Sequence, residues 1–251
     1  MNELDQYTPQ QLKGKNILVT GGTTGIGRSA ARILAALGAN VFINGRHIEQ
    51  LEEAIRDTHK MYPGSNIQGM VSDISDSAGI DRTFEAAEQA YGPIDILINN
   101  AGLSAEGVKD STYEEWQYVL HTNLLSYIAF ANKAVKAMKG RGGHIVNIGS
   151  MSAESRKGES TVYVATKSGI RGFNAALCKE VNPDEIKVTL IEPGAVTSDM
   201  QPGGSEVHQR KIAALEMLAA EDITAGIVYC LSQPKRCNVA SIQIKPLKQE
   251  I

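Results

Sequence analysis

The segment Thr20-Gly21-Gly22-Thr23-Thr24-Gly25-Ile26-Gly27 decides the fold. It follows a short apolar run at 16–20 and precedes a helical pattern at 26–37, which Gly38 ends as a capping glycine. Glycine lets the backbone turn sharply and approach a phosphate, and the N-terminus of the following helix offers N–H groups to the anion. The glycine spacing differs from the G-x-G-x-x-G form. The junction predicts nucleotide binding, with a glycine-rich turn that holds no ligand as the alternative.

The alternation of strand and helix repeats along the chain on either side of this junction. Short apolar runs predict strands, and the longer patterns between them predict helices. Near-continuous apolar strands are typical of a sheet covered on both faces. We therefore predict a Rossmann-like, doubly wound α/β sandwich with a seven-stranded parallel sheet. The expected strands are 16–20, 40–44, 67–71, 94–99, 144–149, 187–191 and 240–245, and the expected helices lie near 26–37, 48–60, 77–91, 113–139, 161–181 and 221–232.

Length and composition exclude several classes of protein. The 251 residues show no linker and fit a single domain, 1–251. The 25 basic and 28 acidic residues give a formal charge of −3, which argues against a nucleic-acid binder. Three cysteines without a C-x-x-C pair fit a reducing cytoplasm and no metal site. No apolar run reaches the ~18–20 residues of a membrane span, so we expect a soluble, cytoplasmic protein.

The end of the second predicted strand bears on the choice of cofactor. An acidic residue about 20 residues after the glycines would bind the ribose hydroxyls of NAD. Gly45 stands at that place instead, and Arg46 follows it. An arginine can hold a 2′-phosphate through two hydrogen bonds, whereas a carboxylate would repel it. The sequence therefore favours NADP, with a solvated arginine at a helix start as the alternative.

Four polar residues are candidates for catalysis. Tyr163 and Lys167 are four residues apart in a predicted helix, so their side chains share one face. A lysine cation there would stabilise the phenolate and lower the tyrosine pKa, although a surface Tyr–Lys pair has the same spacing. Ser150 follows the fifth predicted strand, at the edge where doubly wound sheets hold ligands. Asn123 lies in the long helix before it, where a hydrogen-bonded core residue is the alternative.

In this order the motifs resemble those of the short-chain dehydrogenase/reductase family, over about residues 12–232. The glycine turn resembles the family's T-G-x-x-x-G-x-G motif. Three further segments resemble the adenine-contacting acid after the third strand, the N-N-A-G motif after the fourth, and the P-G-x-x-x-T segment that holds the nicotinamide carboxamide. They are Asp73-Ile74, Asn99-Asn100-Ala101-Gly102, and Pro193-Gly194 with Thr197. Asn123, Ser150, Tyr163 and Lys167 match the family's catalytic tetrad.

The resemblance implies a role for each member of this tetrad. Tyr163 would pass a proton to a carbonyl oxygen or take it from an alcohol. Lys167 would lower the pKa of Tyr163 and hold the nicotinamide ribose, and Ser150 would hydrogen-bond the substrate oxygen. Asn123 would anchor a water that links Lys167 to solvent. The implied cofactor is NADP(H), and its expected contacts are Gly21, Thr23, Gly25, Ile26, Gly27, Arg46, Asp73, Ile74, Asn100, Ala101, Gly102, Tyr163, Lys167, Pro193, Gly194, Val196 and Thr197.

The expected function is that of an NADP(H)-dependent oxidoreductase which interconverts a carbonyl and a secondary alcohol in a small molecule. The alternative is a non-catalytic NADP-binding sensor or scaffold on the same fold. Such proteins usually lose the tyrosine or the lysine, and both are present here. The resemblance also implies a homo-oligomer, either a dimer or a tetramer. The substrate loop is expected at about 195–218, as a mobile lid or as a plain crossover loop.

Overall fold

Seven parallel strands form one sheet in the order β3-β2-β1-β4-β5-β6-β7. The structure is a computed structural model that describes residues 12–156, 158–198 and 203–249. The chain starts at the centre of the sheet, adds strands outward to β3, and then crosses to β4 on the other side of β1. This order confirms the predicted doubly wound sheet. The strands are β1 Asn16–Val19, β2 Asn40–Gly45, β3 Asn66–Val71, β4 Ile96–Asn99, β5 Gly143–Ile148, β6 Ile186–Pro193 and β7 Ser241–Ile244.

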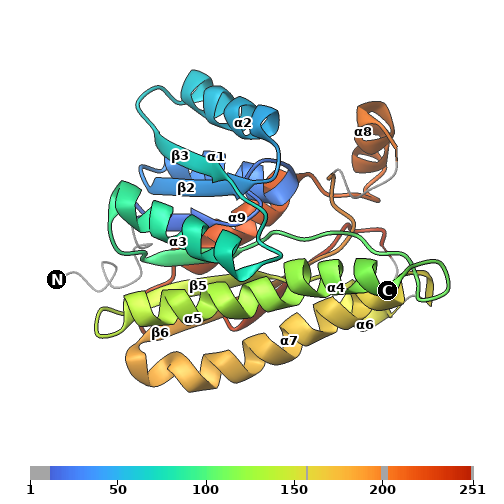
Figure 1. Cartoon of the computed structure of the whole chain (residues 1–251). Coiled ribbons are helices and arrows are strands. Elements are labelled where there is room, and N and C mark those ends of the chain that lie inside the picture. Colours follow the sequence, from blue (N-terminus) through green and yellow to red (C-terminus); the bar gives the residue numbers. More distant parts are fainter. Residues whose placement is uncertain (1–11, 157, 199–202, 250–251) are drawn as a thin grey trace.

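Helices cover both faces of this sheet (Figure 1). On one face α1, α2 and α9 pack against the strands, and on the other face α3, α5 and α7 do so. Their bounds are α1 Gly25–Ala36, α2 Ile48–Met61, α3 Ser77–Tyr91, α4 Tyr113–Leu120, α5 Ser126–Met138, α7 Thr161–Val181 and α9 Ala220–Leu231. Two further helices are α6 Ser152–Ser155 and α8 Ser205–Ala213, and 3-10 turns lie at Gly158–Ser160 and Asn182–Asp184.

Apolar residues of the strands contribute to two hydrophobic cores, one on each face of the sheet. Ile17 and Val19 of β1 belong to the core beneath α1 and α9, whereas Leu18 between them belongs to the core beneath α3 and α5. Side chains alternate across a strand, so a strand buried on both faces is mostly apolar. This is why the strands could be predicted from nearly continuous apolar runs. Polar residues also stand at the ends of several strands, where the cavity described below lies.

Two predicted segments differ from the expected secondary structure. The long helix at 113–139 contains a π-helical turn, His121–Leu125, between α4 and α5. The backbone N–H of Ser126 donates to the carbonyl oxygen of His121 there, five residues back. The expected substrate loop at 195–218 contains helix α8, and its residues 199–202 lie outside the described residues. Hydrophobic periodicity predicted neither feature, because α8 contains no buried residue and a π turn adds only one residue.

His144 on β5 is buried and neutral. Its Nε2 lies 2.8 Å from Oγ1 of Thr189, and that hydroxyl donates to the carbonyl oxygen of Val239 at 2.7 Å. Thr189 therefore accepts from His144, so Nε2 carries the ring hydrogen. Burial lowers the pKa of His144 from 6.5 to about 3. Between pH 6.5 and about 3, His144 is therefore protonated in the unfolded chain but stays neutral in the folded protein.

We expect the buried His144 to lower the stability of the folded protein in mild acid. The free energy of unfolding falls as the pH falls from 6.5 toward 3, and at pH 5 the loss from this group is about 2 kcal/mol. Urea unfolding of the wild type and of His144→Gln at pH 7 and pH 5 measures it. The variant should lose about 2 kcal/mol less than the wild type between these pH values. An equal loss in both proteins would contradict the assignment.

Candidate active site

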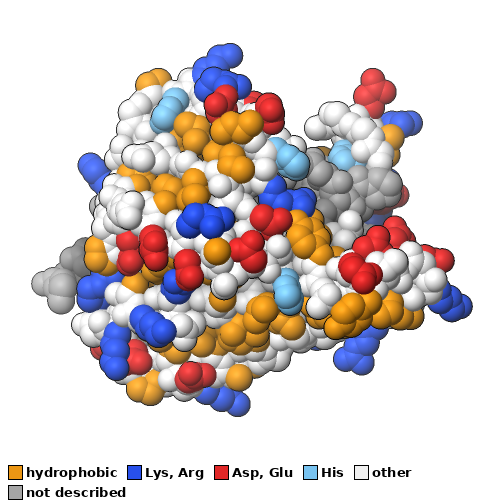
Figure 2. Space-filling model, viewed as in Figure 1, with side chains coloured by type: hydrophobic (Ala, Val, Ile, Leu, Met, Phe, Trp, Pro, Cys, Tyr) orange, Lys and Arg blue, Asp and Glu red, His pale blue; other side chains and the backbone are white. Residues whose placement is uncertain are grey.

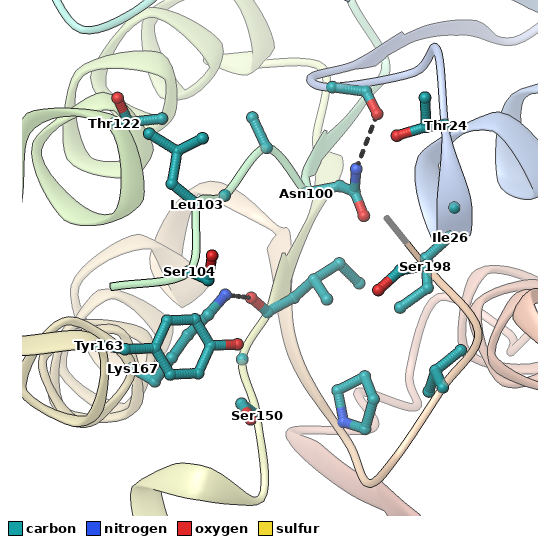
Figure 3. A pocket seen from close by; sticks show the side chains of 18 of the residues that line it. Thr24, Ile26, Asn100, Leu103, Ser104, Thr122, Ser150, Tyr163, Lys167 and Ser198 are labelled. Carbon is teal, nitrogen blue, oxygen red and sulfur yellow. Dashed lines mark hydrogen bonds between the residues drawn. The ribbon is translucent and has the colours of Figure 1, made fainter. Parts of the chain in front are cut away.

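A cavity of about 830 Å³ opens at the carboxyl ends of the strands. Figure 3 shows that side chains from β-strand ends, α7 and the loops point into it. The structure brings most of the predicted residues together in its lining: Gly21, Thr23, Gly25, Ile26, Arg46, Asp73, Ile74, Asn100, Ala101, Gly102, Ser150, Tyr163, Lys167, Pro193, Gly194 and Val196. Gly27, Asn123 and Thr197 are not among the lining residues. Gly27 and Asn123 instead support residues that do line the cavity.

The glycine turn is fastened to the strand beside it. Gly21 has a φ of +63°, and a Cβ on it would lie 2.8 Å from Cα of Ala101. Asn100 Nδ2 donates to the carbonyl oxygens of Thr20 and Gly21, at 3.0 Å each, and Figure 3 marks a hydrogen bond of this amide. A Cβ on Gly27 would lie 2.2 Å from the carbonyl oxygen of Gly21. The turn can therefore hold this shape only with glycine at these two positions.

The turn leads into an uncapped helix end. Helix α1 begins at Gly25, and its N-cap residue Thr24 makes no side-chain capping hydrogen bond. The first turn carries no acidic side chain. Its first N–H groups therefore lack partners within the helix, and the positive end of the helix dipole is not offset. Gly25 and Ile26 line the cavity, so this end of α1 fits a phosphate group.

We call the glycine turn 20–27 and the start of α1 the cradle. Two polar residues that are not among the expected cofactor contacts hold it in place. Oγ1 of Thr20 accepts the N–H groups of Asn100 at 3.0 Å and Ala101 at 3.1 Å. Asn44 at the end of β2 accepts the N–H of Gly21 at 3.1 Å through Oδ1 and donates to the carbonyl oxygen of Ser72 at 3.3 Å. Each is a buried polar residue at the end of an apolar strand, and that position was the available signal.

Tyr163, Lys167 and Ser150 meet in the cavity, as their spacing predicts (Figure 3). Nζ of Lys167 lies 5.7 Å from the ring centre of Tyr163 and donates to the carbonyl oxygen of Ile148 at 2.9 Å. Ser150 and Tyr163 both line this part of the cavity. The Ser150 hydroxyl accepts the N–H of Ser152 at 3.0 Å, which fixes its position at the start of α6.

Burial dominates the protonation of this pair. It raises the pKa of Tyr163 above 10, and the interaction with Ser150 opposes that shift only in part. Tyr163 therefore keeps its proton at neutral pH. Burial lowers the pKa of Lys167 to about 8, and its ammonium group donates to a backbone carbonyl. The lowering of the tyrosine pKa by the lysine stays a prediction.

Asn123 is buried in the π-helical turn and is fully hydrogen-bonded. Its Oδ1 accepts the N–H of Leu103, and its Nδ2 donates to the carbonyl oxygen of the same residue, both at 2.8 Å. Nδ2 also lies 3.4 Å from Oγ1 of Thr166 on α7. The side chain thus joins the loop after β4 to the helix that carries Tyr163. These contacts match the alternative of a hydrogen-bonded core residue, and the role of water anchor stays a prediction.

The segment after β6 is held by the chain's last described residues. The N–H of Gly194 donates to the carbonyl oxygen of Ile244 at 2.8 Å, and the N–H of Ala195 donates to Oε1 of Gln249 at 2.9 Å. Gln249 itself lines the cavity. Sequence reasoning missed it, because a contact between residues 54 positions apart leaves no local pattern. Thr197 lies beside an adjoining cavity near Arg28 rather than in the main one.

In the described part of the chain, no helix is both long and apolar enough to cross a membrane. The same residues contain no group of three or more histidine, cysteine or acidic side chains placed to hold a metal ion.

Comparisons of the sequence point to one family. Residues 15–207 match the family model described as short chain dehydrogenase. The chain is 33% identical to carbonyl reductase family member 4 of Danio rerio over 219 residues, which cover 86% of this chain and 91% of that protein. It is 36% identical to the 3-oxoacyl-[acyl-carrier-protein] reductase FabG of Escherichia coli over 229 residues, which cover 88% and 91%.

Comparisons of the structure agree with those of the sequence. A short-chain dehydrogenase/reductase of Serratia marcescens, solved as a double mutant, superposes with a TM-score of 0.84 at 27% identity, covering 94% of this chain and 98% of the other. A short chain dehydrogenase of Burkholderia cenocepacia, solved in complex with NADP, superposes with a TM-score of 0.83 at 26% identity and the same coverage. The glycine cradle, the sheet order and these matches together show that the chain belongs to the short-chain dehydrogenase/reductase family of oxidoreductases.

Proposed function

We propose that this protein is a single-domain, NADP(H)-dependent oxidoreductase that interconverts a carbonyl group and a secondary alcohol in a small molecule. One observation carries the proposal: Tyr163, Ser150 and Lys167 share a cavity with the glycine turn and the start of α1. The cradle supplies a place for a dinucleotide, and the three side chains supply a proton donor and a hydrogen-bonding group near one point. The printed activities of two relatives, a carbonyl reductase and a 3-oxoacyl reductase, support the same reaction class.

The side chains have the protonation that carbonyl reduction requires. A bound nicotinamide supplies or accepts the hydride. Tyr163 keeps its proton at neutral pH, so its hydroxyl can donate to the carbonyl oxygen as negative charge develops there. Ser150 lies within hydrogen-bonding reach of the same hydroxyl and can stabilise that oxygen. Lys167, with a pKa of about 8, is mostly a cation at neutral pH and favours the tyrosinate that forms.

The residues present fit the phosphorylated form of the cofactor. Gly45 and Arg46 line the cavity where β2 ends, and Gly45 has no carboxylate that would repel a 2′-phosphate. Arg46 is exposed and carries donors that point to no described carboxylate. The relative solved with NADP and the blue fluorescent protein solved with NADPH, 26% identical to this chain, support this choice.

The experiment is a substrate panel followed by the loss of reduced-nicotinamide absorbance. Ketones, aldehydes, 3-oxo acids and sugars are offered with NADPH and, in parallel, with NADH. Turnover of at least one class with NADPH supports the proposal. If NADPH binds and no member of the panel turns over, the second candidate, a cofactor sensor, becomes the better description. If NADPH does not bind at all, both candidates are rejected.

We also propose that the protein forms a homo-oligomer through α4 and α5. Apolar side chains gather along these helices in Figure 2, and Leu120, Leu125 and Ile128 are 39%, 49% and 40% exposed. Apolar groups of this size on neighbouring helical turns favour contact with a second surface. Light scattering on the purified protein is expected to give a multiple of the 27.0 kDa chain mass. Leu125→Glu should shift the mass toward one chain, and a monomeric wild type would reject the proposal.

A further inference from the structure

Three side chains from separate elements are connected by hydrogen bonds near the end of β2, at the edge of the cavity. Arg46 follows β2, Asp73 follows β3, and Tyr118 lies on helix α4. Nη1 of Arg46 donates to the hydroxyl oxygen of Tyr118 at 2.6 Å. That hydroxyl in turn donates to Oδ2 of Asp73 at 2.8 Å. The tyrosine is thus both an acceptor for the cation and a donor to the carboxylate.

Arg46 and Asp73 line the cavity, whereas Tyr118 is absent from its lining. The tyrosine therefore contacts the two charged groups from outside the cavity, and it can influence a ligand in the cavity only through them. The guanidinium carbon also lies 5.9 Å from the Tyr118 ring centre, within the range of a cation–π contact. Asp73 is held a second time, because its Oδ1 accepts the N–H of Ser75 at 2.8 Å.

The interposed hydroxyl keeps two opposite charges apart. Among the described residues Arg46 forms no ion pair with Asp73, although the two charges are near enough to influence each other. Burial raises the pKa of Asp73, but its hydrogen bonds to Ser75 and Tyr118 and the charge of Arg46 outweigh burial, so this pKa lies below 3.8. Without the tyrosine hydroxyl, the carboxylate would be the nearest anion for the guanidinium. An arginine engaged by a carboxylate offers fewer donors and less net positive charge to a phosphate.

We propose that Tyr118 is a positioning residue that sets the preference for the 2′-phosphorylated cofactor by holding Arg46 away from Asp73. One donor of the guanidinium is fixed by the tyrosine oxygen, and four remain for other acceptors. The inference rests on the proposed use of NADP(H). It assigns to a residue outside the cavity a part of the discrimination between NADPH and NADH.

The test is a binding titration that needs no substrate. The full-length protein is titrated with NADPH and, separately, with NADH, and nicotinamide fluorescence gives the two dissociation constants. In Tyr118→Phe we expect the constant for NADPH to rise about 5- to 10-fold, which corresponds to the net free energy of one typical hydrogen bond. The constant for NADH should change less than about 2-fold, because NADH has no 2′-phosphate. The ratio of the two constants is a readout that a merely structural role would not move.

Two further variants bracket this result. Arg46→Ala removes the cation itself and should lower the affinity for NADPH at least as much as Tyr118→Phe does. Tyr113→Phe removes a hydroxyl from a tyrosine on the same helix that is 62% exposed, and it should leave both constants unchanged. The melting temperatures of all three variants, measured without cofactor, show whether they fold as the wild type does.

Each outcome decides the inference. A Tyr118→Phe protein that keeps the wild-type ratio overturns it, whether both constants stay unchanged or rise together. A wild type that binds NADPH no better than NADH overturns the proposed cofactor preference, and the inference falls with it. A wild type that prefers NADPH, with the preference reduced in Tyr118→Phe and intact in Tyr113→Phe, supports both.

Discussion

Replacing Tyr163 with phenylalanine is expected to lower kcat for carbonyl reduction by about 10²- to 10⁴-fold, the usual contribution of a positioned proton donor. The change removes a single oxygen atom from a ring that stays in place. The partly buried tyrosine keeps its proton at neutral pH, so it is the proton donor that we propose. Ser150 has a hydroxyl, but a serine is a far weaker acid than a phenol and cannot replace it.

The measurement uses whichever panel substrate the wild type reduces, with NADPH consumption followed in both proteins. NADPH binding should stay within about 3-fold of wild type, since the hydroxyl belongs to the reacting end of the cavity. Tyr229→Phe is the matched control, because Tyr229 is a 53% exposed tyrosine on α9, and its turnover should be unchanged. A Tyr163→Phe enzyme that keeps more than about a tenth of the activity would rule out this role.

Replacing Gly27 with alanine is expected to weaken NADPH binding at least about 100-fold, or about 2.7 kcal/mol. A Cβ at this position would lie 2.2 Å from the carbonyl oxygen of Gly21 and 2.4 Å from Nδ2 of Asn100. The first atom belongs to the glycine turn and the second holds that turn in place, so the turn must move to make room. The same crowding should lower the free energy of unfolding by about 1–3 kcal/mol.

Gly172→Ala is the control for this change. Gly172 is a helical glycine on α7, and a Cβ there would meet no atom within 4 Å. NADPH binding should be unchanged, and stability should hold or rise by up to about 1 kcal/mol, because alanine favours a helix. Fluorescence titration and urea unfolding of both variants give the comparison. A Gly27→Ala protein with wild-type affinity for NADPH would show that the cradle is not the cofactor's phosphate site.

The parts of the fold that follow from local physics could be predicted from the sequence. β1 and β4 are buried on both faces, so their apolar runs mark them directly. Tyr163 and Lys167 were placed together because four residues make one helical turn, and the structure puts both in the cavity. Gly21 and Gly27 indicated a tight turn, and the close contacts at both positions explain why no larger residue stands there.

What the sequence could not provide depends on contacts between distant residues. Gln249 meets Ala195, and Tyr118 meets Arg46, across 54 and 72 positions of the chain. The protonation of Tyr163 was also out of reach, because it depends on burial rather than on the nearby lysine alone. The spacing of Asn123 placed it in the correct helix, but nothing local indicated that its amide would clamp the backbone of Leu103.

The π-helical turn at His121–Leu125 sets the phase between two helices. Each residue of an α-helix rotates the next by about 100°, so one additional residue turns everything after it by that angle. With this turn in place, Tyr118 on α4 contacts Asp73 and Phe130 on α5 is buried in the core. Deleting one residue here would give a more regular helix, but it would rotate α5 by about 100° relative to α4. The length of this segment is therefore constrained together with the identity of Asn123, whose amide holds Leu103.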